Sequence, residues 1–147
     1  MKALVTALAP SGRPTPTGSV GSFTMATEED VRRIALSLPE TSERPSYEGT
    51  PSFRTKRKAF TRIRGDGESV VVFVDSVEEK EELLASDSRK FFTTPHYDGY
   101  PAVLVRFAET DVEELRELLT DSWRLAAPKR VLAAFEAAEE RDGKKRS

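Results

Sequence analysis

The sequence predicts an α+β fold in which helices pack on one face of a mainly antiparallel five-stranded sheet, in the order αβββαββαα. Three observations predict it. Capping-box patterns begin at Thr27, Ser76 and Thr110, and apolar residues at helical spacing follow each one. Two pairs of β-type segments are joined by short loops, which favours antiparallel pairing. The continuous apolar run 69–74 is typical of a central strand buried on both faces.

Each expected element has a local signal. Pro39 ends the first helix, and the polar stretch 40–49 is expected to be a connection. Pro128 fits the first turn of a last helix, and the stretch 139–147 is expected to be a charged tail. Helices are expected to begin near Thr27, Ser76, Thr110 and Pro128. Strands are expected over 52–55, 59–63, 69–74, 91–94 and 102–107.

The first hairpin has an unusual charge pattern. Between Pro51 and Arg64 the chain has six basic residues and no acidic one. These residues are Arg54, Lys56, Arg57, Lys58, Arg62 and Arg64. A basic hairpin on an acid-rich protein indicates a local anion-binding surface, and nucleic acid is the obvious candidate.

Two registers are open for this hairpin. A two-residue turn at Lys56-Arg57 puts Phe53 and Phe60 on one face, so that both can enter the core. A three-residue loop would instead put Arg54 and Lys56 on the face of Phe60. We favour the first register because it buries both phenylalanines. The favoured two-residue turns need φ > 0, a conformation that arginine rarely adopts, so this turn is expected to be longer or strained.

Composition excludes several classes of function. The chain has 147 residues, no cysteine and one histidine, which excludes disulfides, thiolate metal sites and a cysteine nucleophile. All 25 acidic residues but only 21 of the 23 basic ones follow Thr24, so the part after it has a net charge of −4. Any nucleic-acid binding must therefore rest on a local patch, with modest affinity and strong salt sensitivity.

The ends of the chain differ in composition from the middle. Residues 1–24 are rich in Pro, Ser, Thr and Gly and are expected to be a disordered extension, or the result of a start assigned upstream of Met25. The apolar stretch 3–9 only faintly resembles a signal peptide, and no run is long enough to span a membrane. One domain is expected over 25–140, followed by a charged tail over 141–147.

Several short motifs, in this order and spacing, resemble the MmcQ/YjbR family. They are Leu38-Pro39-Glu40, Pro51-Ser52-Phe53-Arg54, Lys58-Ala59-Phe60, the segment 96–105, and Trp123 with 127–130. The resemblance implies a compact domain related to the frataxin-like (CyaY-like) fold. It also implies two hairpins that have been likened to a double-wing DNA-binding arrangement. Family members often have glycine where this chain has Lys56 and Arg57.

The function expected from these features is that of a cytoplasmic, monomeric, non-enzymatic bacterial protein that binds DNA with low sequence specificity. Lysine and arginine at a wing tip contact phosphates, which position a protein but do not read sequence. No cofactor, catalytic residue or metal site is expected. The alternative is an adaptor domain whose basic hairpin docks an acidic protein. The expected contact residues are Arg54, Lys56, Arg57, Lys58, Arg62, Arg64, Lys129 and Arg130.

Structural explanations compete with these functional ones. Edge strands often carry basic residues to prevent edge-to-edge pairing, and the hairpin could also pair with the acidic stretch 78–82. Lys129 and Arg130 could bridge to acids of the preceding helix. His96 lies in a turn bounded by prolines, so a structural role is favoured over catalysis. The carboxylates of 75–82 read as a solvated face, with a weak divalent-ion surface as a minor hypothesis.

Overall fold

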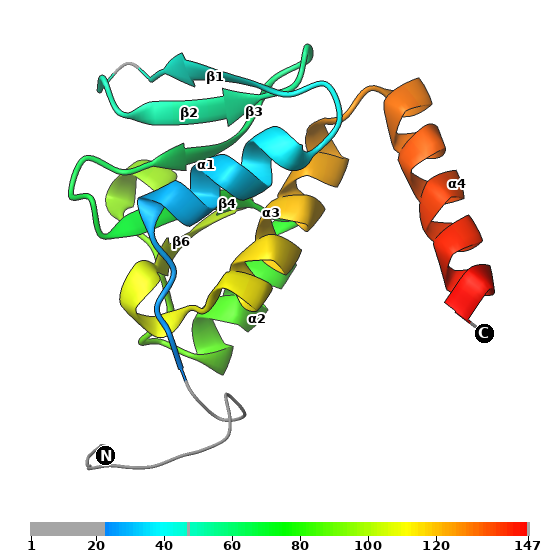
Figure 1. Ribbon diagram of the computed structural model, residues 1–147. Coiled ribbons are helices and arrows are strands. Elements are labelled where there is room, and N and C mark those ends of the chain that lie inside the picture. Colours follow the sequence, from blue (N-terminus) through cyan, green and yellow to red (C-terminus); the bar gives the residue numbers. More distant parts are fainter. Residues whose placement is uncertain (1–22, 47, 147) are drawn as a thin grey trace.

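A computed structural model describes residues 23–46 and 48–146 (Figure 1), so the expectations for residues 1–22 lie outside it. The helices are α1 (Glu28–Ser37), α2 (Val77–Ser86), α3 (Val112–Ala126) and α4 (Lys129–Arg146), with short 3-10 turns at Pro95–Tyr97 and Phe107–Glu109. The strands are β1 (Ser42–Pro45), β2 (Pro51–Arg54), β3 (Ala59–Ile63), β4 (Ser69–Phe73), β5 (Phe91–Phe92) and β6 (Ala102–Arg106). The predicted α+β fold is confirmed.

The described strands form one sheet of six rather than the predicted five, in the order β1-β2-β3-β4-β6-β5. All neighbouring strands are antiparallel. The additional strand is β1, which lies in the stretch predicted to be a connection. Its sequence, Ser-Glu-Arg-Pro, is exposed at every position, so it has no apolar alternation that predicts a strand. Backbone pairing with β2 holds it at the edge of the sheet.

The main core lies between the sheet and two helices, α1 and α3, which cover the same face (Figure 1). Val70 and Val72 of β4 point into this core, whereas Val71 between them points to the opposite face. There it packs with Leu104 in a smaller cluster that Phe92 covers in part. The apolar run of β4 is therefore buried on both faces, as its sequence predicts.

Side-chain hydroxyl or carboxylate caps begin α1, α2 and α3. Thr27 and Asp30 form a complete capping box, with reciprocal bonds of 3.0 and 3.2 Å. Ser76 accepts from the backbone of Glu79 at 3.1 Å. The third expected cap is wrong by one residue. Asp111 caps α3, because the Thr110 hydroxyl is buried and donates to the carbonyl of Arg106 at 3.0 Å.

Helix α4 extends away from the rest of the molecule, and only its first turns contact α3 (Figure 1). Val131 is buried, and the ring of Phe135 packs edge-on against Trp123 with centroids 4.8 Å apart. The helix continues to Arg146, so the stretch expected to be a tail is helical over most of its length. Within the described parts of the chain, no helix has the length and apolar character needed to cross a membrane.

Candidate nucleic-acid interface

The tip of the basic hairpin, residues 55–58, is organised by one hydroxyl. The Thr55 side chain accepts from the backbone N–H groups of Arg57 at 3.0 Å and Lys58 at 3.3 Å. The Thr55 N–H in turn donates to the carbonyl of Lys58 at 3.0 Å. Among the described non-glycine residues only Glu40 has a positive φ, so the strain expected at Lys56 and Arg57 is absent from this turn.

The register of the hairpin agrees with the favoured one at the tip and then shifts. Arg54 lies opposite Ala59, as a two-residue turn at Lys56-Arg57 requires, but Phe53 lies opposite Thr61. The extra residue on β3 is Phe60, which has no partner on β2 in this register. Both phenylalanines are fully buried, as predicted.

The tip is attached to the end of α3. The Thr55 hydroxyl donates to the carbonyl of Ala126 at 2.9 Å, and the Arg57 guanidinium donates to the carbonyls of Ala126 and Ala127 at 3.3 and 3.4 Å. The last carbonyls of a helix have no intrahelical donor, so these contacts supply donors that the helix itself lacks. Arg57, expected to contact phosphate, is thus engaged in holding the tip.

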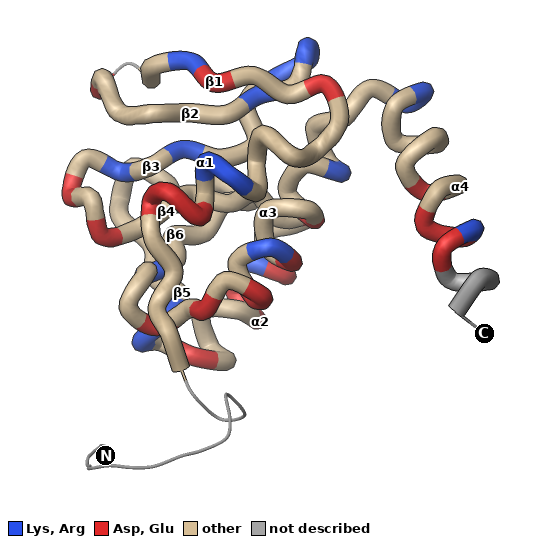
Figure 2. The backbone as a smooth tube through the Cα atoms, viewed as in Figure 1, with Lys and Arg blue, Asp and Glu red and all other residues tan. Residues whose placement is uncertain are grey.

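An open groove of about 750 Å³ lies beside the tip, between the sheet edge and the start of α4. We call it the basic groove. Its lining has four basic side chains and one acidic one. In Figure 2 the basic hairpin tip and the basic first turn of α4 lie at the same end of the molecule. The lining residues are Glu40, Thr41, Ser42, Arg44, Arg54, Thr55, Lys56 and Arg130.

Three of the groove cations have little or nothing to bind within the protein. Over the described ranges 23–46 and 48–146, the side chains of Arg44 and Lys56 make no ion pair and no hydrogen bond. Arg54 makes one long bond, 3.3 Å, to the adjacent carbonyl of Thr55. An arginine or lysine without an internal partner keeps its donors available to an external anion.

The fourth groove cation has a partner on the groove wall. Both terminal nitrogens of Arg130 donate to the carboxylate of Glu40, each at 3.2 Å. This hydrogen bonding holds the pKa of Glu40 below its usual value, and the charge of Lys56 adds to the effect. Arg130 therefore does not bridge to acids of α3, as the competing explanation required.

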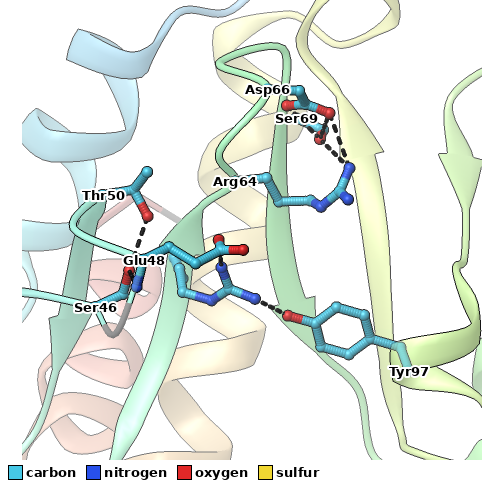
Figure 3. Close-up of polar contacts among 8 residues, drawn as sticks. Ser46, Glu48, Thr50, Arg64, Asp66, Ser69 and Tyr97 are labelled. Carbon is cyan, nitrogen blue, oxygen red and sulfur yellow. Dashed lines mark hydrogen bonds and ion pairs between the residues drawn. The ribbon is translucent and has the colours of Figure 1, made fainter.

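Three other arginines on the face of the sheet away from α1 and α3 are bound internally, and we call them the paired arginines. Arg62 donates to Glu48 at 2.7 Å and to the Tyr97 hydroxyl. Figure 3 shows Arg64 directed at Asp66 and Ser69, at 2.8 and 3.2 Å. Arg106 donates to the carbonyl of Arg89 at 2.8 Å, and its guanidinium lies 4.0 Å from the centre of the Phe92 ring.

The remaining expected contact residues lie outside the groove. Lys58 is exposed on the other side of the tip, where it lines a small hollow of about 230 Å³ with Phe73 and Pro101. Lys129 is exposed in the first turn of α4. The structure therefore gathers Arg54, Lys56 and Arg130 from the expected set. It adds Arg44, which sequence reasoning missed because the strand that carries it was not predicted.

The competing explanation by edge protection is wrong for this hairpin. Strand β1 pairs along the outer side of β2, so neither hairpin strand is at the edge of the sheet. The acidic helix α2 does not neutralise the hairpin either, because the described ion pairs of Arg62 and Arg64 go to Glu48 and Asp66.

The other candidate residues, His96 and the carboxylates of α2, lie outside the basic groove. No cluster of three or more His, Asp or Glu side chains there is placed to hold a metal ion. His96 packs edge-on against Tyr97 in an exposed turn. That turn is fixed by the buried Lys80, whose ammonium donates to the carbonyls of Tyr97 and Tyr100 at 2.6 and 3.1 Å. A lysine within an acidic helix gave no sequence signal for this role.

Comparison with known proteins places the fold in a family. The family model YjbR matches residues 36–125. Uncharacterised proteins of Mycobacterium tuberculosis (strain H37Rv) and Mycobacterium bovis are 40% identical over 124 residues, which covers 76% of this chain and 96% of theirs. A crystal structure of a Deinococcus radiodurans protein with a DUF419 domain superposes with a TM-score of 0.59. It is 27% identical, with coverage of 69% of this chain and 78% of that one. The chain belongs to the YjbR family.

Proposed function

We propose that this protein is a non-enzymatic DNA-binding module that holds the phosphate backbone in the basic groove. The observation that carries the proposal is the placement of Arg44, Arg54 and Lys56 around one open groove without ion-pair partners in the described residues. Two of the paired arginines, Arg62 and Arg64, instead bind carboxylates of the protein itself. Several cations with available donors in the basic groove favour the binding of an external anion there.

The chemistry of the groove favours a chain of phosphates. The guanidinium fork matches phosphate oxygens in pairs, and lysine adds a point charge beside it. The lining is polar and open, which suits an extended ligand better than an enclosed small molecule. The described residues that line the groove include no apolar side chain that could insert between bases, so the expected contacts position DNA without reading its sequence.

The net charge of −2 limits the expected affinity. About three phosphate contacts give a log–log salt slope of about −2.7, so affinity should fall roughly 40-fold between 50 and 200 mM salt. This dependence separates phosphate binding from an apolar association, which salt does not weaken.

The test is titration of a labelled 20-base-pair duplex with the parent protein and two double variants, at both salt concentrations. The first variant, Arg44→Ala with Lys56→Ala, removes two groove cations. The matched control, Arg89→Ala with Arg116→Ala, removes two exposed arginines that do not line the groove, so its net charge is the same. We expect the groove variant to lose at least about tenfold in affinity and about 2 in salt slope, and the control to change little.

Three outcomes contradict parts of the proposal. No duplex binding by the parent at 50 mM salt removes DNA as the ligand. Equal losses in both variants show a general charge effect, so that the groove is not the site. If the parent protein does not bind DNA but binds a purified acidic protein, and Lys56→Ala abolishes that binding, the adaptor alternative is favoured.

A further inference from the structure

Glu40, on the wall of the basic groove, has an unusual backbone conformation. Its φ is +55°, and it is the one described non-glycine residue in the left-handed region. Side chains with a Cβ are disfavoured there, and such residues persist only where the surroundings determine the backbone. Glycine would adopt this backbone conformation without strain, yet the chain has a residue with a carboxylate here.

The surroundings hold the backbone on both sides of Glu40. The indole N–H of Trp123, which is fully buried, donates to the carbonyl of Pro39 at 3.2 Å. The hydroxyl of Thr41 donates to the carbonyls of Ala35 and Leu38 at 2.8 and 3.1 Å. These bonds fasten the turn after α1 to the core, and the turn directs the Glu40 carboxylate to Arg130.

Stability alone is a poor explanation for this carboxylate. The Arg130 side chain is 70% exposed and that of Glu40 is 38% exposed. Ion pairs so exposed contribute little to folding, because water and salt screen them. The same two-pronged contact, however, is the one that arginine makes with a phosphate group.

We propose that Arg130 is a phosphate subsite of the basic groove, and that the Glu40 carboxylate occupies it until a DNA phosphate displaces it. The inference rests on the proposed function and names a further contact for the same ligand. A phosphate chain already bound by Arg44, Arg54 and Lys56 displaces an exposed carboxylate at small cost. A single anion lacks those additional contacts, so Glu40 makes the groove selective for polyvalent phosphates over small anions.

The test compares two variants that each remove one carboxylate bonded to an arginine. Glu40→Gln opens the proposed subsite. Glu136 lies on α4 outside the groove lining, and Glu136→Gln removes a carboxylate that accepts a hydrogen bond from Arg124 of α3. Both raise the net charge by one, so a general charge effect acts on both. In the duplex titration at 50 mM salt, we expect Glu40→Gln to bind about three- to tenfold more tightly and Glu136→Gln to change less than twofold.

Two further measurements make the test specific. Glu40→Gly removes the carboxylate while suiting the positive φ, so it should bind as tightly as Glu40→Gln and unfold at a higher temperature than that variant. In an Arg130→Ala background, most of the gain from Glu40→Gln should disappear, because the subsite itself is gone.

The outcomes separate this inference from the proposed function. If the parent binds duplex but Glu40→Gln and Glu136→Gln behave alike, or the gain survives in full without Arg130, the subsite is wrong and the DNA function stands. If neither the parent nor any variant binds duplex at 50 mM salt, both are wrong. Tighter binding of Glu40→Gln and Glu40→Gly, lost without Arg130, supports the subsite.

Discussion

The basic groove and the paired arginines use the same residue type in opposite ways. Arg62 and Arg64 each bind a carboxylate and a hydroxyl of the protein, and Arg106 binds backbone carbonyls and an aromatic ring. Arg44 and Lys56 have no comparable partner in the described chain. A count of basic residues in the hairpin therefore overstates the number that an anion can use.

Burial explains much of the difference. The side chains of Arg62 and Arg64 are 15% and 25% exposed, so a guanidinium there without partners would lose hydration with nothing in return. The protein supplies those partners itself. Lys56 is exposed at the tip, where water hydrates its ammonium group. For these mostly buried arginines, the partners built into the fold therefore indicate a structural role, whereas the exposed Lys56 has no such partner.

The largest expected effect tests the structural half of this comparison. Arg62→Ala should lower the free energy of unfolding by about 2 kcal/mol, because it removes charged hydrogen bonds and a mostly buried stem. Chemical denaturation measures it. Affinity for duplex DNA, measured on the folded variant, should change less than for Lys56→Ala.

Arg62→Lys serves as the control for charge. It keeps the cation but loses the planar fork that joins Glu48 to Tyr97. A stability loss with unchanged DNA affinity agrees with a structural role. A variant as stable as the parent would show that the fork does not matter and would break the comparison.

A smaller effect is expected at the hairpin tip, where Arg57, which binds backbone carbonyls, is next to Lys56, whose side chain has no described partner. Arg57→Ala should lower the free energy of unfolding by about 1 kcal/mol, because the carbonyls of Ala126 and Ala127 lose a donor. Lys56→Ala should leave stability unchanged and weaken DNA binding. Thermal melting and duplex titration of both variants measure this pair of opposite responses. The reverse assignment, with Arg57 the stronger DNA contact, would contradict it.

The smallest expected effect concerns the strand that carries Arg44. Glu43 of β1 accepts two bonds of 3.0 Å from Arg32 of α1, and this hydrogen bonding holds the pKa of Glu43 below its usual value. The unfolded chain therefore takes up the proton first as pH falls. The contribution of this ion pair to folding stability is complete above the ordinary glutamate pKa of 4.5. It is lost as pH falls through the lower pKa of Glu43 in the folded protein.

Because this pair is partly exposed, its contribution to stability should be only about a few degrees in melting temperature. Melting curves of the parent and Glu43→Gln between pH 3 and pH 7, roughly the range over which carboxylates titrate, measure it. The difference between the two proteins should be present at neutral pH and shrink toward the acid end. A difference that grows toward acid would contradict the direction of the shift.

The fold was largely predictable because its elements have local signals. Val70 and Val72 lie in an apolar run, and Thr27 and Asp30 form a capping box that needs only four consecutive residues. Strand β1 was not predictable in this way, since its polar residues pair through the backbone alone. The shift of the third cap from Thr110 to Asp111 was missed because Thr110 is drawn to a carbonyl four residues earlier.

The sequence predicted the basic character of the site, but not which of its cations are bound within the protein and which are available. Arg54, Lys56 and Arg130 were identified as basic surface residues, and the fold brings them to one groove. Which cations remain available depends on contacts between distant parts of the chain. Arg57 reaches a carbonyl 69 residues away, and Glu40 reaches an arginine 90 residues away. Such pairs leave no local pattern in the sequence.

The attachment of the hairpin tip to α3 bears on the thermodynamics of recognition. Because Thr55 fixes the turn and also joins it to Ala126, the hairpin tip is ordered without a ligand. Flexible basic loops lose conformational entropy on binding, whereas a preorganised one avoids most of that cost. Association at the tip should therefore resemble the docking of two rigid bodies, driven by the entropy of released counterions.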